Sequence, residues 1–156
     1  MSGWWRWLKS AVRGSRPHSR DPVAYFSQGL ANANPDVRAG AARKLGELGP
    51  EAAPAAVPLL VKALEDPDGA VRSSAALSLG SFGEMAAPAV NGLVRLLADP
   101  DDDVRSSAGI ALLDIGPPAR EAVEAALESP DPMVRAEAAN IWRRLGPKDG
   151  RNGKGA

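Results

Sequence analysis

A Val-Arg dipeptide recurs at nearly constant spacing along this 156-residue chain and constrains its fold more than any other feature. The four copies are Val37-Arg38, Val71-Arg72, Val104-Arg105 and Val134-Arg135. Successive copies are 34, 33 and 30 residues apart, and the surrounding residues agree in register, as in DPDGAVRSSAALSLGSFG and DPDDDVRSSAGIALLDIG. A period of this length is typical of folds in which small helical units stack in a row.

Each repeat is expected to fold as two antiparallel helices. The first helix begins at a residue that can cap the free amides of its first turn. These caps are Asn34, Asp68, Asp101 and Asp131. Apolar residues then recur at helical spacing, and a glycine follows the helix. In the first three repeats a second helix follows, with its apolar face marked by Val57, Val90 and Val123. The sequence predicts an all-α fold, a right-handed α-solenoid of stacked antiparallel helix pairs over residues 21–146.

An arginine stands four residues after each cap. The four members of this column are Arg38, Arg72, Arg105 and Arg135. A column at one register can bond to carbonyl groups or aspartates of a neighbouring repeat, so we interpret it as a structural ladder between repeats. The alternative is a row of arginines that binds a ligand.

Three aspartates at alternate positions, Asp99, Asp101 and Asp103, look like the start of a calcium-binding loop. Such a loop needs glycine at its sixth position and glutamate at its twelfth. This chain has Val104 and Ile110 there. Asp101 is better explained as a helix cap, with its neighbours close to the positive end of the helix dipole. No metal site is predicted.

Composition excludes several further functions. The chain has no cysteine and one histidine, His18, so we expect no catalytic residue, no metal and no cofactor. Residues 1–20 hold five basic residues and no acid, whereas residues 21–146 hold 11 bases and 18 acids. An acidic body argues against a nucleic-acid groove. No apolar run approaches the length of a membrane span, and a cytoplasmic protein is expected.

The pattern DPDxxVRxxAAxxLGxxG, followed by a second amphipathic helix, resembles HEAT repeats of the short type named after phycobilisome lyases. The resemblance covers residues 21–146. It implies an interaction scaffold, although similar proteins include chromophore lyases and a metal-dependent hydroxylase. Those hydroxylases hold iron with repeated His-Glu pairs, and the single His18 is followed by Ser19, which excludes that activity. An accessory subunit of a lyase-type enzyme stays open as an alternative.

The resemblance also implies that the second helices line a concave binding surface. Outward positions on these helices are Pro58, Asn91 and Glu124 in one row and Lys62, Arg95 and Glu128 in another. The second row changes sign along the stack, which suits a partner peptide with its own charge asymmetry. We therefore expect a monomeric, non-catalytic adaptor for a protein or peptide partner. The alternative is that these are ordinary solvated side chains.

The N-terminal twenty residues are not explained by the repeat. On a helix, Trp4, Trp5, Trp7 and Leu8 fall on one side, and basic residues fall opposite within residues 4–13. Such a helix could lie on a membrane, which would make the chain a peripheral membrane adaptor. Alternatively it is a degenerate first helix whose tryptophans close the apolar end of the stack, or a targeting arm. The glycine-rich, basic residues 147–156 are expected to be disordered.

Overall fold

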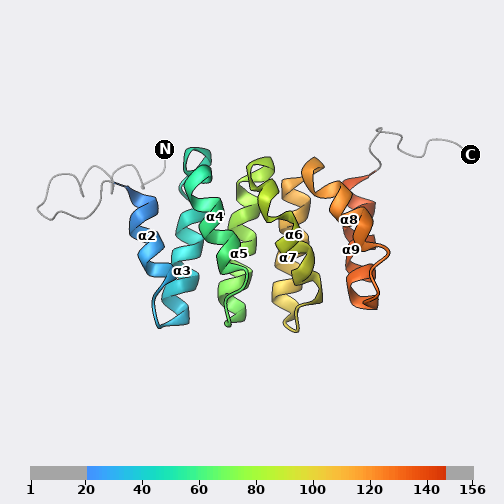
Figure 1. The fold of residues 1–156 in the computed structure, drawn as a ribbon, viewed down its shortest axis with the longest axis horizontal. Helices are drawn as coiled ribbons and strands as arrows, with labels where there is room; N and C mark the ends of the chain where they lie inside the picture. The colour runs from blue at the N-terminus through green and yellow to red at the C-terminus, as the bar shows by residue number, and fades with distance from the viewer. Residues whose placement is uncertain (1–20, 147–156) are drawn as a thin grey trace, which may run out of the picture.

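The computed structural model describes residues 21–146, which form eight α-helices joined by turns and 3₁₀ helices and contain no strand (Figure 1). The α-helices are α2 (Pro22–Leu30), α3 (Pro35–Gly46), α4 (Ala53–Ala63), α5 (Gly69–Ser81), α6 (Val90–Arg95), α7 (Asp102–Ile115), α8 (Arg120–Ala126) and α9 (Pro132–Leu145). The 3₁₀ helices are η1 (Pro50–Ala52), η2 (Gly83–Ala89), η3 (Leu96–Ala98) and η4 (Pro117–Ala119). The prediction of an all-α fold is confirmed.

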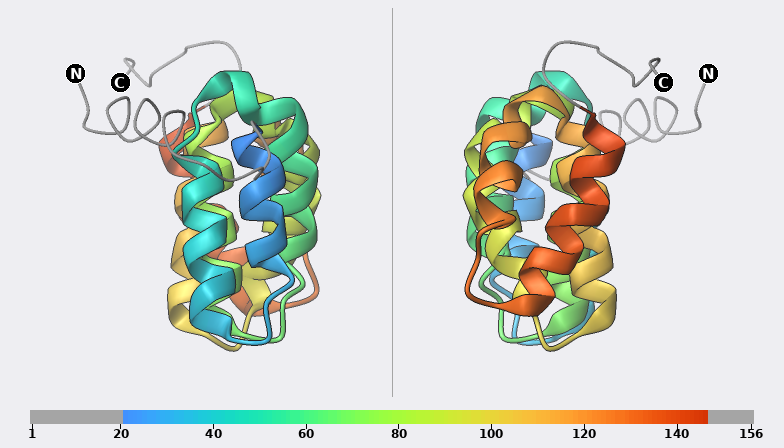
Figure 2. Two further views of the ribbon diagram at one scale, coloured as in Figure 1. Left: turned by 90° about the vertical axis from the view of Figure 1, so that its left-hand side faces the viewer. Right: turned by 90° about the vertical axis from the view of Figure 1, so that its right-hand side faces the viewer.

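The helices form two layers, which we call the A helices (α3, α5, α7 and α9) and the B helices (α2, α4, α6 and α8). Seen from the N-terminal end of the stack, the chain rises through each A helix, crosses at the top and descends through the next B helix (Figure 2). It turns clockwise as it moves away from the viewer. The stack is therefore a right-handed α-solenoid, as predicted.

Each A helix begins at a polar side chain. The side-chain oxygens of Asn34, Asp68, Asp101 and Asp131 each accept a hydrogen bond from the amide two residues further on, at 2.8–2.9 Å. Asp21 does the same at the start of α2, at 2.9 Å. These bonds satisfy amides that have no partner within the helix.

The B helices are less regular than the second helices that the sequence predicts. Three of them begin with a 3₁₀ segment, and α6 has only six residues between η2 and η3. Prolines account for much of this difference, because proline lacks the amide that an α-helix needs and favours the first turn. Pro50 and Pro117 open η1 and η4, and Pro88 lies inside η2.

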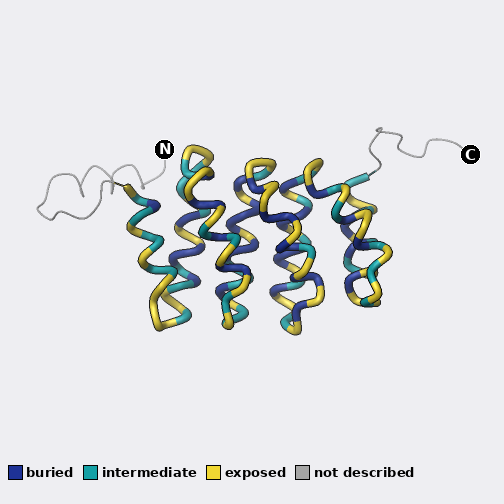
Figure 3. Tube along the Cα trace, in the orientation of Figure 1, coloured by how far each residue is buried: buried dark blue, intermediate teal, exposed yellow. Residues whose placement is uncertain are grey.

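The core runs through the whole stack as one cluster of small and branched apolar residues (Figure 3). Leu45, Leu79 and Leu112 of the A helices and Leu60 and Leu93 of the B helices are completely buried. Alanine and glycine let neighbouring A helices approach closely. A Cβ atom at Gly80 of α5 would lie 3.1 Å from the Ala111 Cα of α7. The low aromatic content of the chain is thus compatible with a tightly packed core.

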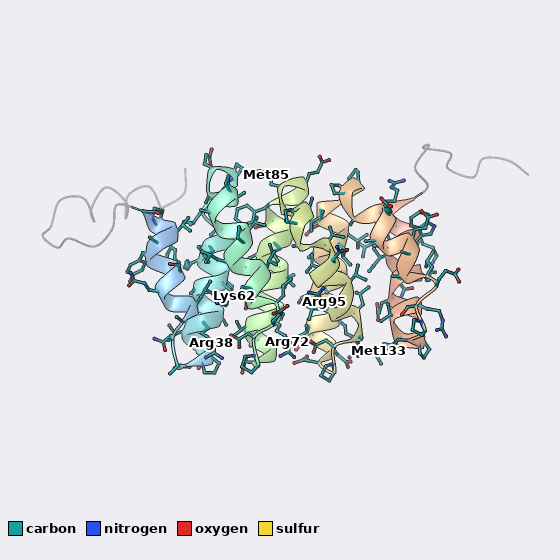
Figure 4. All side chains as sticks on the ribbon, viewed as in Figure 1. Arg38, Lys62, Arg72, Met85, Arg95 and Met133 are labelled. Atoms are coloured by element: carbon teal, nitrogen blue, oxygen red, sulfur yellow. The ribbon has the colours of Figure 1, made fainter. Side chains whose placement is uncertain are left out.

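Two arginines of the column join successive repeats. Arg38 donates from Nε and Nη2 to both carboxylate oxygens of Asp66, at 2.8 and 2.9 Å. Arg72 makes the same bidentate pair with Asp99, at 2.8 and 2.9 Å. Each arginine also donates from Nη1 to carbonyl groups of the turn before its own helix. Both ion pairs lie at the lower edge of the stack, near the labels of Arg38 and Arg72 in Figure 4.

The ladder stops after these two rungs, which corrects the expectation of a continuous column. Arg105 pairs with Asp102 of its own helix and donates to the Asp99 carbonyl at 2.7 Å. Arg135 donates to the carbonyl groups of Ser129 and Pro130. The physical reason is that Ser129 occupies the position held by Asp66 and Asp99 in earlier repeats, so Arg105 has no carboxylate to reach across the interface.

The two interrepeat ion pairs change the pKa values of the residues that form them. The hydrogen bond from Arg38 lowers the pKa of Asp66, against the effect of burial. Burial alone would raise the pKa of Asp99, but the Arg72 guanidinium and the Asp101 amide together hold it below its ordinary value. The pKa values of Arg38 and Arg72 are raised by the same hydrogen bonds. Both carboxylates are therefore held ionised in the folded chain.

Candidate functional site

The B helices present a continuous row of exposed side chains to solvent, which we call the B-helix face. Val57, Val90 and Val123 point inward and are buried, so the residue after each points outward. These outward residues are Pro58, Asn91 and Glu124. One helical turn further on lie Lys62, Arg95 and Glu128, which are also exposed. All the candidate partner-binding residues are exposed on the B helices or directly after them. Figure 4 labels two of them, Lys62 and Arg95.

The charged side chains of this face are largely free to meet a partner. Arg95 lies 3.6 Å from the Glu65 carboxylate, and both side chains are more than two thirds exposed. An ion pair so open to water contributes little to stability, so a partner can displace it at small cost. Lys62 and Arg95 outnumber Glu65 and leave one half of the face net basic, whereas Glu124 and Glu128 make the other half acidic.

The upper part of the same face holds an apolar depression of about 440 Å³ between α4 and η2, which we call the proline groove. It is lined by Ala53, Pro54, Val57, Pro58, Val61, Met85 and Pro88. Its lining includes Met85, which is 46% exposed although it is a large apolar residue. An exposed methionine beside three prolines gives an adaptable apolar contact surface.

A second, smaller depression of about 150 Å³ lies between α7 and α9 on the A-helix side. It is lined by Arg105, Ser106, Gly109, Ile110, Leu113, Glu137, Asn140, Ile141 and Arg144. This lining mixes charges of both signs with apolar residues, and its volume is below the range of ordinary small-molecule pockets.

The acidic residues at the starts of the A helices bond to protein groups. Asp99 binds Arg72, and Asp101 accepts from the Asp103 amide. Between residues 21 and 146, no group of three histidine, aspartate or glutamate side chains is arranged to hold a metal ion. Of the helices placed in this range, none has the length and apolar character that crossing a bilayer needs.

The candidate membrane or partner contacts Trp4, Trp5, Trp7 and Leu8 lie outside the described residues. The N-terminal end of the stack, which they were expected to close, is formed by α2 and α3. Tyr25 and Val37 are exposed there. Lys44 in the last turn of α3 and Glu47 directly after the helix form an ion pair, with both side chains about half exposed. This end therefore combines apolar and charged residues.

Sequence reasoning missed most of the proline groove. Only Pro58 was recognised as an outward position, while Pro54, Val61, Met85 and Pro88 were not singled out. The available signal was a proline at two places one turn apart in a single helix, followed in the next repeat by an outward methionine. Of these, the exposed methionine is the stronger signal, because methionine is usually buried whereas proline is usually exposed.

The fold and this exposed face define a class, the α-solenoid proteins built from helical repeats. The family model for HEAT repeats matches residues 23–113 and 90–150. The chain belongs to the HEAT-repeat family. A search among curated proteins gives no match.

Solved structures with this fold include both engineered and natural proteins. An engineered protein solved by the Northeast Structural Genomics Consortium is 27% identical, with a TM-score of 0.60, over 80% of this chain and 62% of that chain. A second engineered protein from that consortium is 26% identical, with a TM-score of 0.53, over 81% of this chain and 38% of that chain. This chain therefore spans less than two thirds of either structure.

The complex of CpcE and CpcF of phycocyanin lyase from Nostoc sp. PCC7120 is also similar. It is 28% identical to this chain with a TM-score of 0.55, and the match covers 92% of this chain and 56% of that one. Together with the family match, this confirms the predicted identification as a HEAT-repeat protein of the phycobilisome-lyase-like type.

Proposed function

We propose that this chain is a non-catalytic scaffold that binds a segment of a partner protein along its B-helix face. The observation that supports this most is the exposed row of Lys62, Arg95 and Glu128, which crosses three repeats and changes sign along the stack. Stacked repeats characteristically bind through such extended surfaces. The likeness to a complex of two lyase chains supports a protein partner.

The charge order of the face defines the chemistry of the partner. The acidic residues of the partner would lie against α4 and α6, and the basic residues of the partner would lie against α8. Neighbouring helices pack about 10 Å apart, so the three B helices span about 20 Å. An extended chain covers this distance with about six residues. The partner segment is therefore a short peptide with acidic residues at one end and basic residues at the other.

A synthetic peptide of this type, labelled with a fluorophore, tests the proposal by fluorescence polarisation. The double variant Lys62→Glu/Arg95→Glu should weaken binding about tenfold, because two attractive contacts become repulsive. Arg143→Glu/Arg144→Glu is the matched control, since it makes the same change in net charge on exposed residues of α9. Equal weakening by both variants, or none by either, would contradict the proposed face.

A second candidate function is that of an accessory subunit of a chromophore-lyase-type enzyme. The likeness to the phycocyanin lyase complex, over 92% of this chain, favours it specifically. The test is titration of the full chain with an open-chain tetrapyrrole, followed by absorbance. A saturable spectral change that Pro58→Asp removes would support this function. An unchanged spectrum at micromolar protein would contradict it.

A further inference from the structure

The proline groove has an apolar lining that runs from a buried floor to an exposed rim. Its floor includes Ala53 and Val57, which are almost completely buried, and its rim includes the half-exposed Met85. Its volume of about 440 Å³ lies within the ordinary range of ligand pockets. Prolines fix the backbone beneath the rim, so little conformational entropy is lost when an occupant binds.

The charges around the groove favour a basic occupant at its upper end. Glu51 precedes the groove residue Ala53 by two positions, and Glu84 stands directly before Met85. Both glutamates are exposed. Lys62 follows Val61 at the opposite end, on the charged row already described. An occupant that extends from the apolar lining toward η1 and the start of η2 would therefore meet carboxylates.

The first twenty residues of this chain have the matching chemistry. They carry three tryptophans and Leu8 together with five basic residues and no acid, whereas residues 21–146 have seven more acids than bases. Large aromatic side chains gain the most from burial in such a groove. Aromatic residues flanked by bases suit a surface that is apolar at its centre and acidic at its upper edge.

The connection to the stack is short enough to place these residues in the groove. The described chain begins at Asp21, at the top of α2, and α2 packs beside α4 (Figure 1). The groove lies two helices along, toward the top of the stack, where Figure 4 labels Met85. Two helix spacings amount to about 20 Å. Residues 14–20 span up to about 23 Å when extended.

The N-terminal end of the stack is the competing location, and it is less suited. Ser78 and Ser81 of α5 bond to the Ala42 and Gly46 carbonyl groups of α3. The equivalent residues of α3 are Lys44 and Glu47, whose ion pair faces outward. A charged pair at this position is typical of the polar outer face of a terminal repeat, which is exposed to water. We propose that residues 4–13 of this chain bind in the proline groove of the same molecule, with tryptophan side chains against Met85 and Val61.

Tryptophan fluorescence of the full chain tests this assignment in a Trp142→Phe background, where only Trp4, Trp5 and Trp7 report. The emission should already be blue in buffer relative to the chain in guanidinium chloride. Met85→Glu should shift it to the red and lower the bound-to-free ratio of the segment about tenfold, which corresponds to about 1.4 kcal/mol. Val61→Asp should shift the emission to the red as well, which would show that the effect is not specific to the substitution of Met85.

Met133→Glu is the matched control, because Met133 is also 46% exposed but lies at the start of α9. It should leave the emission unchanged, and the helical circular dichroism of every variant should match the parent. Red emission in buffer that turns blue only with anionic phosphatidylserine vesicles would overturn the proposal in favour of a membrane contact. Blue emission that responds to Tyr25→Gln but not to Met85→Glu would overturn it in favour of the stack end. Blue emission that shifts to the red on dilution would overturn it in favour of binding of the segment to the groove of a second copy of the chain.

Discussion

The Arg72 guanidinium donates two parallel hydrogen bonds to the Asp99 carboxylate of the next repeat, with Nε–Oδ2 and Nη2–Oδ1 distances of 2.8 and 2.9 Å. The same guanidinium donates to the Asp66 and Pro67 carbonyl groups of its own turn. Asp99 in turn accepts from the Asp101 amide at 3.0 Å. One side chain thus ties two loops and one helix start together.

Removing this side chain should destabilise the stack. Arg72→Ala leaves the buried Asp99 carboxylate without its cation, which should lower the free energy of unfolding by about 2–3 kcal/mol. Arg105→Ala should cost about 1 kcal/mol or less, since Arg105 pairs only with the exposed Asp102 and a carbonyl of its own repeat. Urea unfolding followed by circular dichroism measures both values. Equal losses would show that the interrepeat bond adds nothing.

A third interrepeat ion pair can be introduced at Ser129. Ser129→Asp places a carboxylate at the position of Asp66 and Asp99, where it can accept from Arg105, and should raise the free energy of unfolding by about 1 kcal/mol. Ser129→Asn is the control, because its side chain can still accept from the Asp131 amide, as the Ser129 hydroxyl does, without the charge. Stabilisation by both variants alike would mean that the turn, rather than the ladder, had improved.

The two interrepeat ion pairs also make the free energy of unfolding depend on pH. The pKa values of Asp66 and Asp99 are lower in the folded chain than in the unfolded one, so their contribution is complete above about pH 4. It is lost as the pH falls through the folded values. The partner arginines titrate far above this range. In Asp99→Asn, the loss of stability between pH 5 and pH 2, followed by thermal unfolding, should be shallower than in the parent. An unchanged slope would contradict this account.

Two glycines of α3 should respond to alanine in opposite directions. A Cβ atom at Gly46 would lie 2.6 Å from the Ser78 Cβ and 2.9 Å from its Cα, so Gly46→Ala must push α3 and α5 apart and should cost about 1–3 kcal/mol. Nothing lies within 4 Å of a Cβ atom at Gly40, and Gly40→Ala should stabilise the helix by about 0.5–1 kcal/mol. Melting temperatures that move in the same direction would show that the close approach is not limiting.

Much of the fold could be predicted from sequence because each repeat carries its own local signals. A cap, an apolar face and a terminal glycine act within one helix, and four copies in register indicate that similar units stack in a row. The end of the ladder could not be read from the arginine alone, since its partner lies 27 or 28 residues further along the chain. That a serine at position 129 ends the ladder can be recognised only when it is known which loops face each other.

The B helices and their groove were harder to predict for a related reason. Pro88 indicates a break but not its extent, and η2 runs for seven residues around it. Met85 lies within this 3₁₀ segment and lines the groove together with Pro54 and Pro58 of α4. The charged row was easier to place, since its members follow helical spacing from buried valines.

The most direct test of the scaffold account is residue-resolved amide NMR of the full chain during titration with the charge-asymmetric peptide. Saturable shift changes are expected for Lys62, Arg95 and Glu128 and their B-helix neighbours, with the A helices unaffected apart from the ends that adjoin them. Changes centred on the depression between α7 and α9, or no saturable change at millimolar peptide, would contradict the claim that the B-helix face binds the partner.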